Sequence, residues 1–111
     1  MLIVPPNVKI YLYNNYTDMR KACQTLAVIV TDIIGQNPLD GSMYVFFNKY
    51  KNKIKILHWH QNGFWLHYKN LTKGKFIIPE INGNECIHST ELYSLLESAA
   101  YVAINRHSKL F

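Results

Sequence analysis

The stretch from Met43 to Pro79 constrains the fold more than any other part of the chain. It consists of short apolar segments, rich in β-branched and aromatic residues, that are separated by polar turns. Ile54–His60 and Gly63–Lys69 flank the dipeptide Asn62-Gly63. Asn-Gly strongly favours a β-hairpin, because both central residues of a type I′ turn need positive φ. The sequence therefore predicts a hairpin that turns at Asn62-Gly63.

A turn at Asn62-Gly63 also predicts which residues pair. Gln61 would face Phe64, and the next pairs would be His60 with Trp65, Trp59 with Leu66, His58 with His67 and Leu57 with Tyr68. Because side chains alternate between the two faces of a sheet, one face would carry Leu57, Trp59, Phe64, Leu66 and Tyr68. The other face would carry Ile56, His58, His60, Trp65, His67 and Lys69. We interpret the first face as packed and the second as exposed to water.

The remaining pattern predicts two helices and further strands. Val8–Tyr13 alternates as a strand does, and helical spacing then runs from an N-cap at Thr17, with Asp18 beside it, to a stop at Gly35. A second helix is predicted from Glu91 to about Tyr101, with Ser89 or Thr90 as its cap and with Leu92, Leu95, Leu96 and Ala99 on one stripe. Further strands are predicted at residues 42–48, 53–60, 63–70 and 75–79, with a short edge strand at 85–88.

Short connections between these strands favour an antiparallel meander. The predicted fold class is α+β: a small antiparallel sheet of about four to five strands, packed by two α-helices on one face. The length of 111 residues is typical of a single domain, predicted at residues 1–104, with a loose tail at 105–111.

Cysteine usage and hydropathy predict a cytoplasmic protein. Cys23 and Cys86 are far apart and belong to no CxxC pair, so reduced thiols are expected. The opening residues are too few and no later run is long enough to predict a signal peptide or a membrane span. The formal net charge of +5 instead favours an anionic partner, of which nucleic acid is the commonest.

The residues give little support to catalysis. Six of the seven acidic residues lie on predicted helices and loops, and only Glu85 falls on a predicted strand. A two-metal nuclease instead needs several carboxylates that converge on one point. The sequence contains neither a GxSxG motif nor a glycine-rich phosphate loop. We therefore predict no enzyme and no cofactor. The one metal alternative is a site formed by His58, His60 and His67, for which the hairpin offers no Asp, Glu or Cys.

Basic and aromatic residues are interleaved in the central stretch. Seven of the twelve Lys and Arg residues lie between residues 49 and 75. Lysines in turns can reach phosphates, and exposed aromatic rings can stack on bases. Lysines at sheet edges can equally protect against edge-to-edge pairing.

Several motifs, in order, resemble the small accessory protein of the insertion sequence 66 family of bacterial transposable elements. The matching segments are Thr17–Lys21 with Leu26, Gly41–Phe46, Lys53–Leu57 with Trp59, Asn62–Leu66, Tyr68-Lys69, Leu71, Lys73–Phe76 with Pro79, and Glu91–Glu97. The chain departs from the family pattern at His60, Asn70 and Ile78, where the family usually has Asp, Arg and Trp, and its closing helix lacks the Gly-Ile-Asp ending.

The resemblance implies a protein that assists transposition and is distinct from the catalytic transposase encoded beside it. The implied partners are transposon DNA and that transposase, with no membrane. On this basis the predicted DNA-binding residues are Arg20, Lys21, Tyr50, Lys51, Lys53, Trp65, Lys69, Lys73 and Lys75. The Thr17–Arg20 turn also has a purely structural interpretation, as a helix cap followed by a core methionine. A competing function is a protein–protein adaptor, in which the face carrying Trp65 docks on the transposase and the charge only assists encounter.

Overall fold

The computed structural model of the protein describes residues 2–81 and 86–97. The predicted tail at 105–111 lies outside these residues, so the division at residue 104 stays a prediction. In chain order the elements are β1 (Ile10–Tyr16), α1 (Cys23–Ile29), the π-helical η1 (Val30–Ile34), β2 (Met43–Phe47), β3 (Lys53–His60), β4 (Gly63–Asn70) and β5 (Cys86–Ile87), followed by a helix over residues 89–97. The α+β fold class is confirmed.

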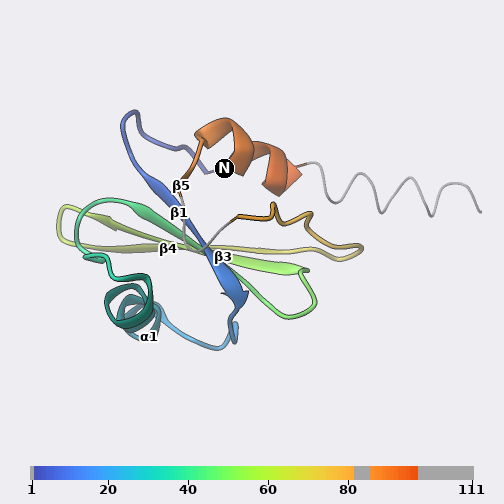
Figure 1. Cartoon of the computed structure of the whole chain (residues 1–111), viewed down its shortest axis with the longest axis horizontal. Coiled ribbons are helices and arrows are strands. Elements are labelled where there is room, and N and C mark those ends of the chain that lie inside the picture. Colours follow the sequence, from blue (N-terminus) through green and yellow to red (C-terminus); the bar gives the residue numbers. More distant parts are fainter. Residues whose placement is uncertain (1, 82–85, 98–111) are drawn as a thin grey trace, which may run out of the picture.

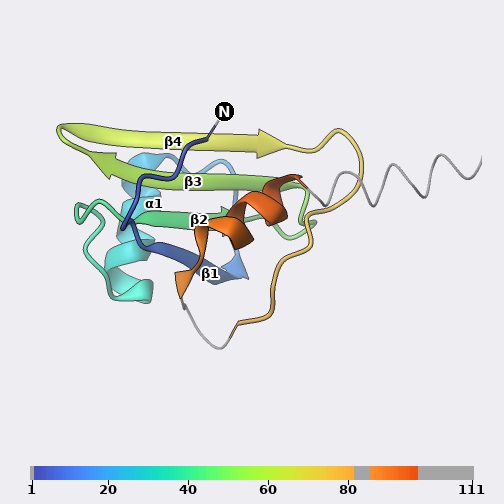
Figure 2. The ribbon, with the colours of Figure 1, turned by 90° about the horizontal axis from the view of Figure 1, so that it is seen from above.

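The five strands form one sheet in the order β4-β3-β2-β1-β5. The run β2-β3-β4 is the predicted antiparallel meander, but β1 pairs with β2 in parallel, with Ile10 opposite Met43 and Leu12 opposite Val45. The expectation of a purely antiparallel sheet was therefore wrong. Parallel neighbours need a crossover, and α1 with η1 provides it by returning the chain to the end of the sheet where β1 began (Figures 1 and 2).

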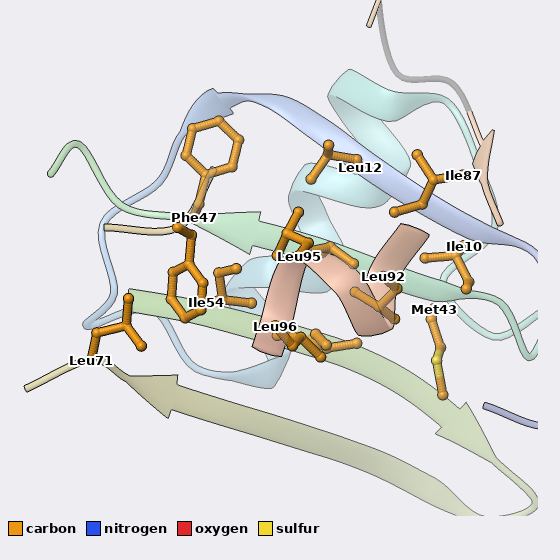
Figure 3. Packing of buried hydrophobic residues seen from close by; sticks show 13 residues of the cluster. Ile10, Leu12, Met43, Phe47, Ile54, Leu71, Ile87, Leu92, Leu95 and Leu96 are labelled. Atoms are coloured by element: carbon orange, nitrogen blue, oxygen red, sulfur yellow. The ribbon is translucent and has the colours of Figure 1, made fainter. Parts of the chain in front are cut away.

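The two helices lie on opposite faces of the sheet (Figure 1). On one face Leu26 and Val30 pack against Tyr11, Tyr44 and other residues of the strands. On the other face the 89–97 helix packs against Ile10, Leu12 and their neighbours (Figure 3). The prediction that both helices cover one face was wrong. All five residues of β2 are buried, which is typical of a strand that is covered on both sides.

The 89–97 helix is anchored by Leu92, Leu95 and Leu96, which point into the core in Figure 3. The N-terminal segment packs beside it: Leu2, Val4 and Val8 contact the same cluster, and the Val4 N–H donates to the Tyr93 hydroxyl at 2.8 Å. This face therefore combines segments from both ends of the described chain. The predicted stripe of leucines on the second helix is confirmed.

Both predicted helix caps differ from the observed ones. Ala22 occupies the N-cap of α1 and makes no side-chain cap, whereas Thr17 follows β1 and its N–H donates to the Phe47 carbonyl at 2.8 Å. In the second helix the carboxylate of Glu91 accepts from the His88 N–H at 3.0 Å, which places the cap at His88. Gly35 does end η1, in a left-handed conformation with φ of 76°.

The segment 75–79 does not form the predicted strand. It passes the end of the sheet as a loop in which Phe76 is buried in the core and the flanking Lys75 and Ile77 are exposed. The Phe76 N–H donates to the Lys51 carbonyl at 2.6 Å. The buried Phe76 side chain therefore anchors this loop to the core, although the segment makes no ladder of strand hydrogen bonds.

The β3–β4 hairpin turns one residue earlier than predicted. His60 pairs with Gly63 and Trp59 with Phe64, so the turn residues are Gln61-Asn62. Gln61 has a positive φ of 58°, and the Asn62 N–H donates to the His60 carbonyl at 2.7 Å. The rings of Trp59 and Phe64 meet edge to face with centroids 5.0 Å apart, a contact that the predicted register would have separated.

This shift of register leaves each hairpin side chain on the face predicted for it. The new pairing slides the strands by two residues relative to the predicted one, and side chains alternate with a period of two. The two predicted sets of hairpin side chains therefore stay together. The expectation of a wet second face was wrong, because its members Ile56 and His58 are buried.

The turn gives a direct test of the register. Gln61→Gly should raise the free energy of unfolding by up to about 1 kcal/mol, because glycine tolerates positive φ while glutamine is strained there. Asn62→Gly should not stabilise, since Asn62 does not have positive φ. Urea denaturation of the two variants measures both changes. If Asn62→Gly stabilised the protein and Gln61→Gly did not, the turn residues would be Asn62-Gly63, as the sequence predicted.

Candidate nucleic-acid interface

Three segments meet at one end of the sheet. Parallel pairing brings the ends of β1 and β2 together, with Tyr16 opposite Phe47, and antiparallel pairing sets the start of β3 beside the end of β4, with Lys53 opposite Asn70. The loops that leave these strands, at residues 17–22, 48–52 and 71–81, therefore begin or turn at the same end (Figure 2).

The turn at residues 48–52 is held by its asparagines. The Asn48 side-chain oxygen accepts from the N–H groups of Asn52 and Lys53, each at 3.0 Å, and its amide nitrogen donates to the Asn52 side-chain oxygen at 2.6 Å. The Lys51 N–H donates to the Asn48 carbonyl at 3.0 Å, and Lys51 itself has a φ of 58°. These bonds fix the backbone, so the lysines of the turn project from a defined scaffold.

The loop after β4 is fastened to that turn. The Leu71 N–H donates to the Asn52 carbonyl at 2.8 Å, and the Phe76 N–H donates to the Lys51 carbonyl at 2.6 Å. Leu71 and Phe76 are both buried, whereas Lys73 and Lys75 between and beside them are exposed. The structure thus places two basic loops next to each other.

We call the resulting surface the cationic end. Its members share a position in or beside these loops: Arg20, Lys49, Lys51, Lys53, Lys73 and Lys75. All are exposed except Lys53, which is half-buried. Acidic residues at this end are few: Asp18 lies beside Arg20, Glu80 lines a hollow together with Lys51, and Glu97 lines another hollow together with Lys69 near the end of β4. A positive field is expected here because, among the described residues, only Arg20 of these cations forms an ion pair with a carboxylate.

Arg20 and Asp18 form an exposed ion pair. The Arg20 guanidinium donates to both carboxylate oxygens, at distances of 2.7 to 3.1 Å, and the Arg20 backbone N–H donates to the same carboxylate at 2.9 Å. These hydrogen bonds to Arg20 hold the pKa of Asp18 well below its usual range. Met19 between them packs against the core beneath α1. Met19 supports one half of the structural interpretation of this turn, whereas the other half was wrong because Thr17 does not cap a helix.

Other predicted site residues lie elsewhere or serve the fold. The Lys69 ammonium donates to the Leu96 carbonyl at 2.8 Å and so ties β4 to the 89–97 helix. Lys21 is half-buried, and its carbonyl accepts from the Lys55 ammonium at 3.0 Å. Trp65 is 60% exposed but lies near the start of β4, at the opposite end of the sheet from the cationic end. Tyr50 is 66% exposed and belongs to the cationic end's turn.

The predicted DNA-binding set lacked two residues of this surface, Tyr16 and Lys49. Tyr16 ends β1 with its side chain 63% exposed, and it lines the same cleft as Lys49, Tyr50 and Lys53. Only the parallel pairing of β1 with β2 brings Tyr16 to that place. Lys49 was visible in the sequence as part of the lysine cluster, but nothing there distinguished it from its neighbours.

The histidines of the hairpin lie on one face without forming a metal site. His58 and His60 have ring centroids 6.2 Å apart, and the His67 ring stacks on Trp65 at 6.3 Å. Over residues 2–81 and 86–97, no group of three or more His, Cys, Asp or Glu side chains is arranged to hold a metal ion. Burial, and then the charges of His60 and His67, lower the pKa of His58, and burial lowers the pKa of His67.

These shifts predict that acid destabilises the fold. The unfolded chain binds protons at His58 and His67 near the ordinary pKa of about 6.5, while the folded chain binds them only at lower pH. The contribution of these two histidines to the free energy of unfolding should therefore be fully present above about pH 6.5, and it should be lost as the pH falls below that value. Urea midpoints at pH 7.5 and 5.5 measure the decline, and His58→Gln should reduce it. An unchanged decline in that variant would assign the effect to other groups.

Comparison with known proteins identifies the family. The family model described as "IS66 Orf2 like protein" matches residues 8–106, which include every described strand and helix. The chain belongs to this family. The resemblance noted in the sequence is thus confirmed, and the family suggests an accessory role in transposition of insertion-sequence elements.

Curated relatives of this IS66 Orf2-like protein are uncharacterised. The protein y4hO of Sinorhizobium fredii is 32% identical over 98 residues, covering 88% of this chain and 85% of the relative. A second protein of that organism, y4jC, is 28% identical over 89 residues, covering 80% and 76%. No solved structure matches the chain. None of the helices that the structure describes has the length and apolar character needed to cross a membrane.

Proposed function

We propose that this protein is a non-catalytic accessory factor that binds the DNA of its element through the cationic end. The observation that carries the proposal is the convergence of six basic residues from separate loops on one end of the sheet. Such a surface can neutralise several phosphates at once, which supplies most of the affinity of non-specific DNA binding and much of that of specific binding.

The rigidity of this surface supports the proposal. The asparagine-held turn and the loop fastened to it keep Lys49, Lys51, Lys73 and Lys75 close together before any ligand arrives. Preorganised contacts lose less conformational entropy on binding than mobile ones. Lysines that served only to block edge pairing would lie along β4, the long edge strand, whereas most of these lie in loops.

The test is a DNA-binding titration at two salt concentrations, with element-end duplex compared with scrambled duplex. We expect log K to fall with log salt by about 0.9 for each phosphate neutralised. Preference for the element ends would indicate end recognition, and equal binding would indicate a general electrostatic contact. Absence of binding at low salt would overturn the proposal.

A second candidate function is an adaptor that docks on the transposase. It is favoured by β4, an eight-residue strand at the edge of the sheet whose outer side pairs with no strand in the described ranges. Trp65 projects from this strand and borders a hollow lined also by Leu2 and Leu96. Open edges and exposed aromatic residues both suit protein partners.

The adaptor has its own test. Trp65→Ala should weaken capture of the purified transposase of the same element by this protein while leaving DNA affinity unchanged. The complementary variant Lys73→Glu should weaken DNA binding and leave capture unchanged. Loss of capture in Lys73→Glu alone would move the transposase contact to the cationic end.

A further inference from the structure

A cleft of about 370 Å³ opens at the cationic end. Its volume falls within the range of small-ligand pockets, roughly 300–1,000 Å³. It lies between the end of β1, the 17–22 loop and the 48–52 turn. Its lining is Tyr16, Thr17, Asp18, Met19, Arg20, Asn48, Lys49, Tyr50 and Lys53. All of these residues except Thr17 are exposed or half-buried, so the cleft is not an unfilled part of the core.

Two exposed tyrosines border this cleft. Tyr16 and Tyr50 are 63% and 66% exposed, and neither belongs to the hydrophobic core. Tyr16 is positioned by the pairing of its backbone with Phe47, and Tyr50 by the hydrogen-bonded asparagine turn. Single exposed aromatic residues need no explanation, but two held at one cleft provide surfaces on which a planar ring can stack.

The cations of the cleft remain available to a ligand. Within the described ranges the ammonium groups of Lys49 and Lys53 form no ion pair or hydrogen bond. The Arg20 guanidinium is oriented by Asp18, and that pair adds no net charge. Thr17 also lines the cleft, and its buried hydroxyl has no hydrogen-bond partner among the described residues. Stacking rings beside free ammonium groups suit a ligand that joins a flat ring to a phosphate.

We propose that this cleft binds an unpaired nucleotide of single-stranded DNA, with the base stacking on Tyr16 or Tyr50 and the phosphates contacting Lys49 and Lys53. The inference rests on the proposed DNA-binding function and specifies the form of DNA. Bases within a duplex stack on one another and present only their edges, so a side chain can stack on a base only where the strands are separated. Strand ends and melted junctions would provide such bases.

The test compares a short oligothymidine with a duplex of equal length by fluorescence anisotropy. A variant carrying Tyr16→Leu and Tyr50→Leu removes both rings and keeps apolar bulk. It should lose about tenfold or more in affinity for the single strand, since stacking contributes about 1–3 kcal/mol per base. The duplex, which contacts the loops through phosphates, should lose less than about twofold.

Two matched variants separate stacking from other causes. Tyr16→Phe with Tyr50→Phe keeps the rings and should bind the single strand within about twofold of wild type. Trp65→Leu removes an exposed ring at the far end of the sheet and should bind it unchanged. Circular dichroism of each variant verifies that the fold is retained.

The outcomes distinguish this inference from the proposed function. Salt-sensitive binding of both DNAs that is unaffected by the leucine pair, or equally reduced by it, would overturn the nucleotide cleft and leave the cationic end intact. Absence of binding to either DNA at low salt would overturn both. Selective loss of the single strand in the leucine pair, together with its recovery in the phenylalanine pair, would support the cleft.

Discussion

The triple substitution Lys49→Glu, Lys73→Glu and Lys75→Glu, which reverses three charges, is expected to weaken binding to duplex DNA on the order of 100-fold at 0.1 M salt. Each lysine that contacts a phosphate releases close to one counterion, so losing three contacts should also lower the slope of log K against log salt by about 2.7. The three side chains are exposed and come from two adjoining loops, so the fold should tolerate the change. Titrations of wild type and variant at several salt concentrations measure both quantities.

A single-residue comparison controls for net charge. Lys73→Glu and Lys9→Glu alter the charge equally, and both side chains are exposed. Lys9 precedes β1, at the end of the sheet opposite the cationic end. Lys73→Glu should weaken binding and lower the slope, whereas Lys9→Glu should have a much smaller effect. Equal effects of the two changes would assign binding to the overall charge and not to this surface.

Phe46→Ala is expected to cost about 3–5 kcal/mol of unfolding free energy. Phe46 is fully buried in β2, on the face covered by α1, and its ring meets Tyr13 edge to face at 5.9 Å. The loss should lower the melting temperature by roughly 15–30 °C in a domain of this size. Thermal and urea unfolding measure it. Ile77→Ala, at a residue 60% exposed, should change stability by less than about 0.5 kcal/mol.

The same substitution tests the two-sided architecture. If both helices covered the opposite face, Phe46 would lie against water and its removal would cost little. A loss below about 1 kcal/mol would therefore contradict the packing of α1 on this face. The equivalent experiment on the other face is Leu92→Ala, which removes a fully buried contact of the 89–97 helix and should cost about 2–5 kcal/mol.

Local sequence patterns predicted most of the elements and less of their arrangement. The alternation in β3 and β4, the stop at Gly35 and the leucines of the second helix were sufficient to place those elements. The Asn62-Gly63 dipeptide misplaced the turn by one residue because its local preference competes with pairing over the whole hairpin. Contacts such as Trp59 with Phe64 outweigh the preference of a single turn.

The hairpin side chains were still assigned to the correct faces, for a physical reason. Alternation has a period of two, and the actual register differs from the predicted one by two residues. By contrast, the parallel pairing of β1 was not visible in local patterns. Both a parallel and an antiparallel β1 satisfy the same alternation of Tyr11 and Leu12, and only the crossover through α1 distinguishes them.

The candidate site divides in the same way. The sequence by itself determined the cluster of lysines at the turns, the exposed Tyr50 and the family to which the chain belongs, because these depend on residue identity and local spacing. The tertiary structure alone decided that Tyr16 joins Tyr50 at one cleft, that Lys69 bonds to Leu96 and that Trp65 lies at the far end. These relations depend on strand order and helix placement, which long-range packing sets.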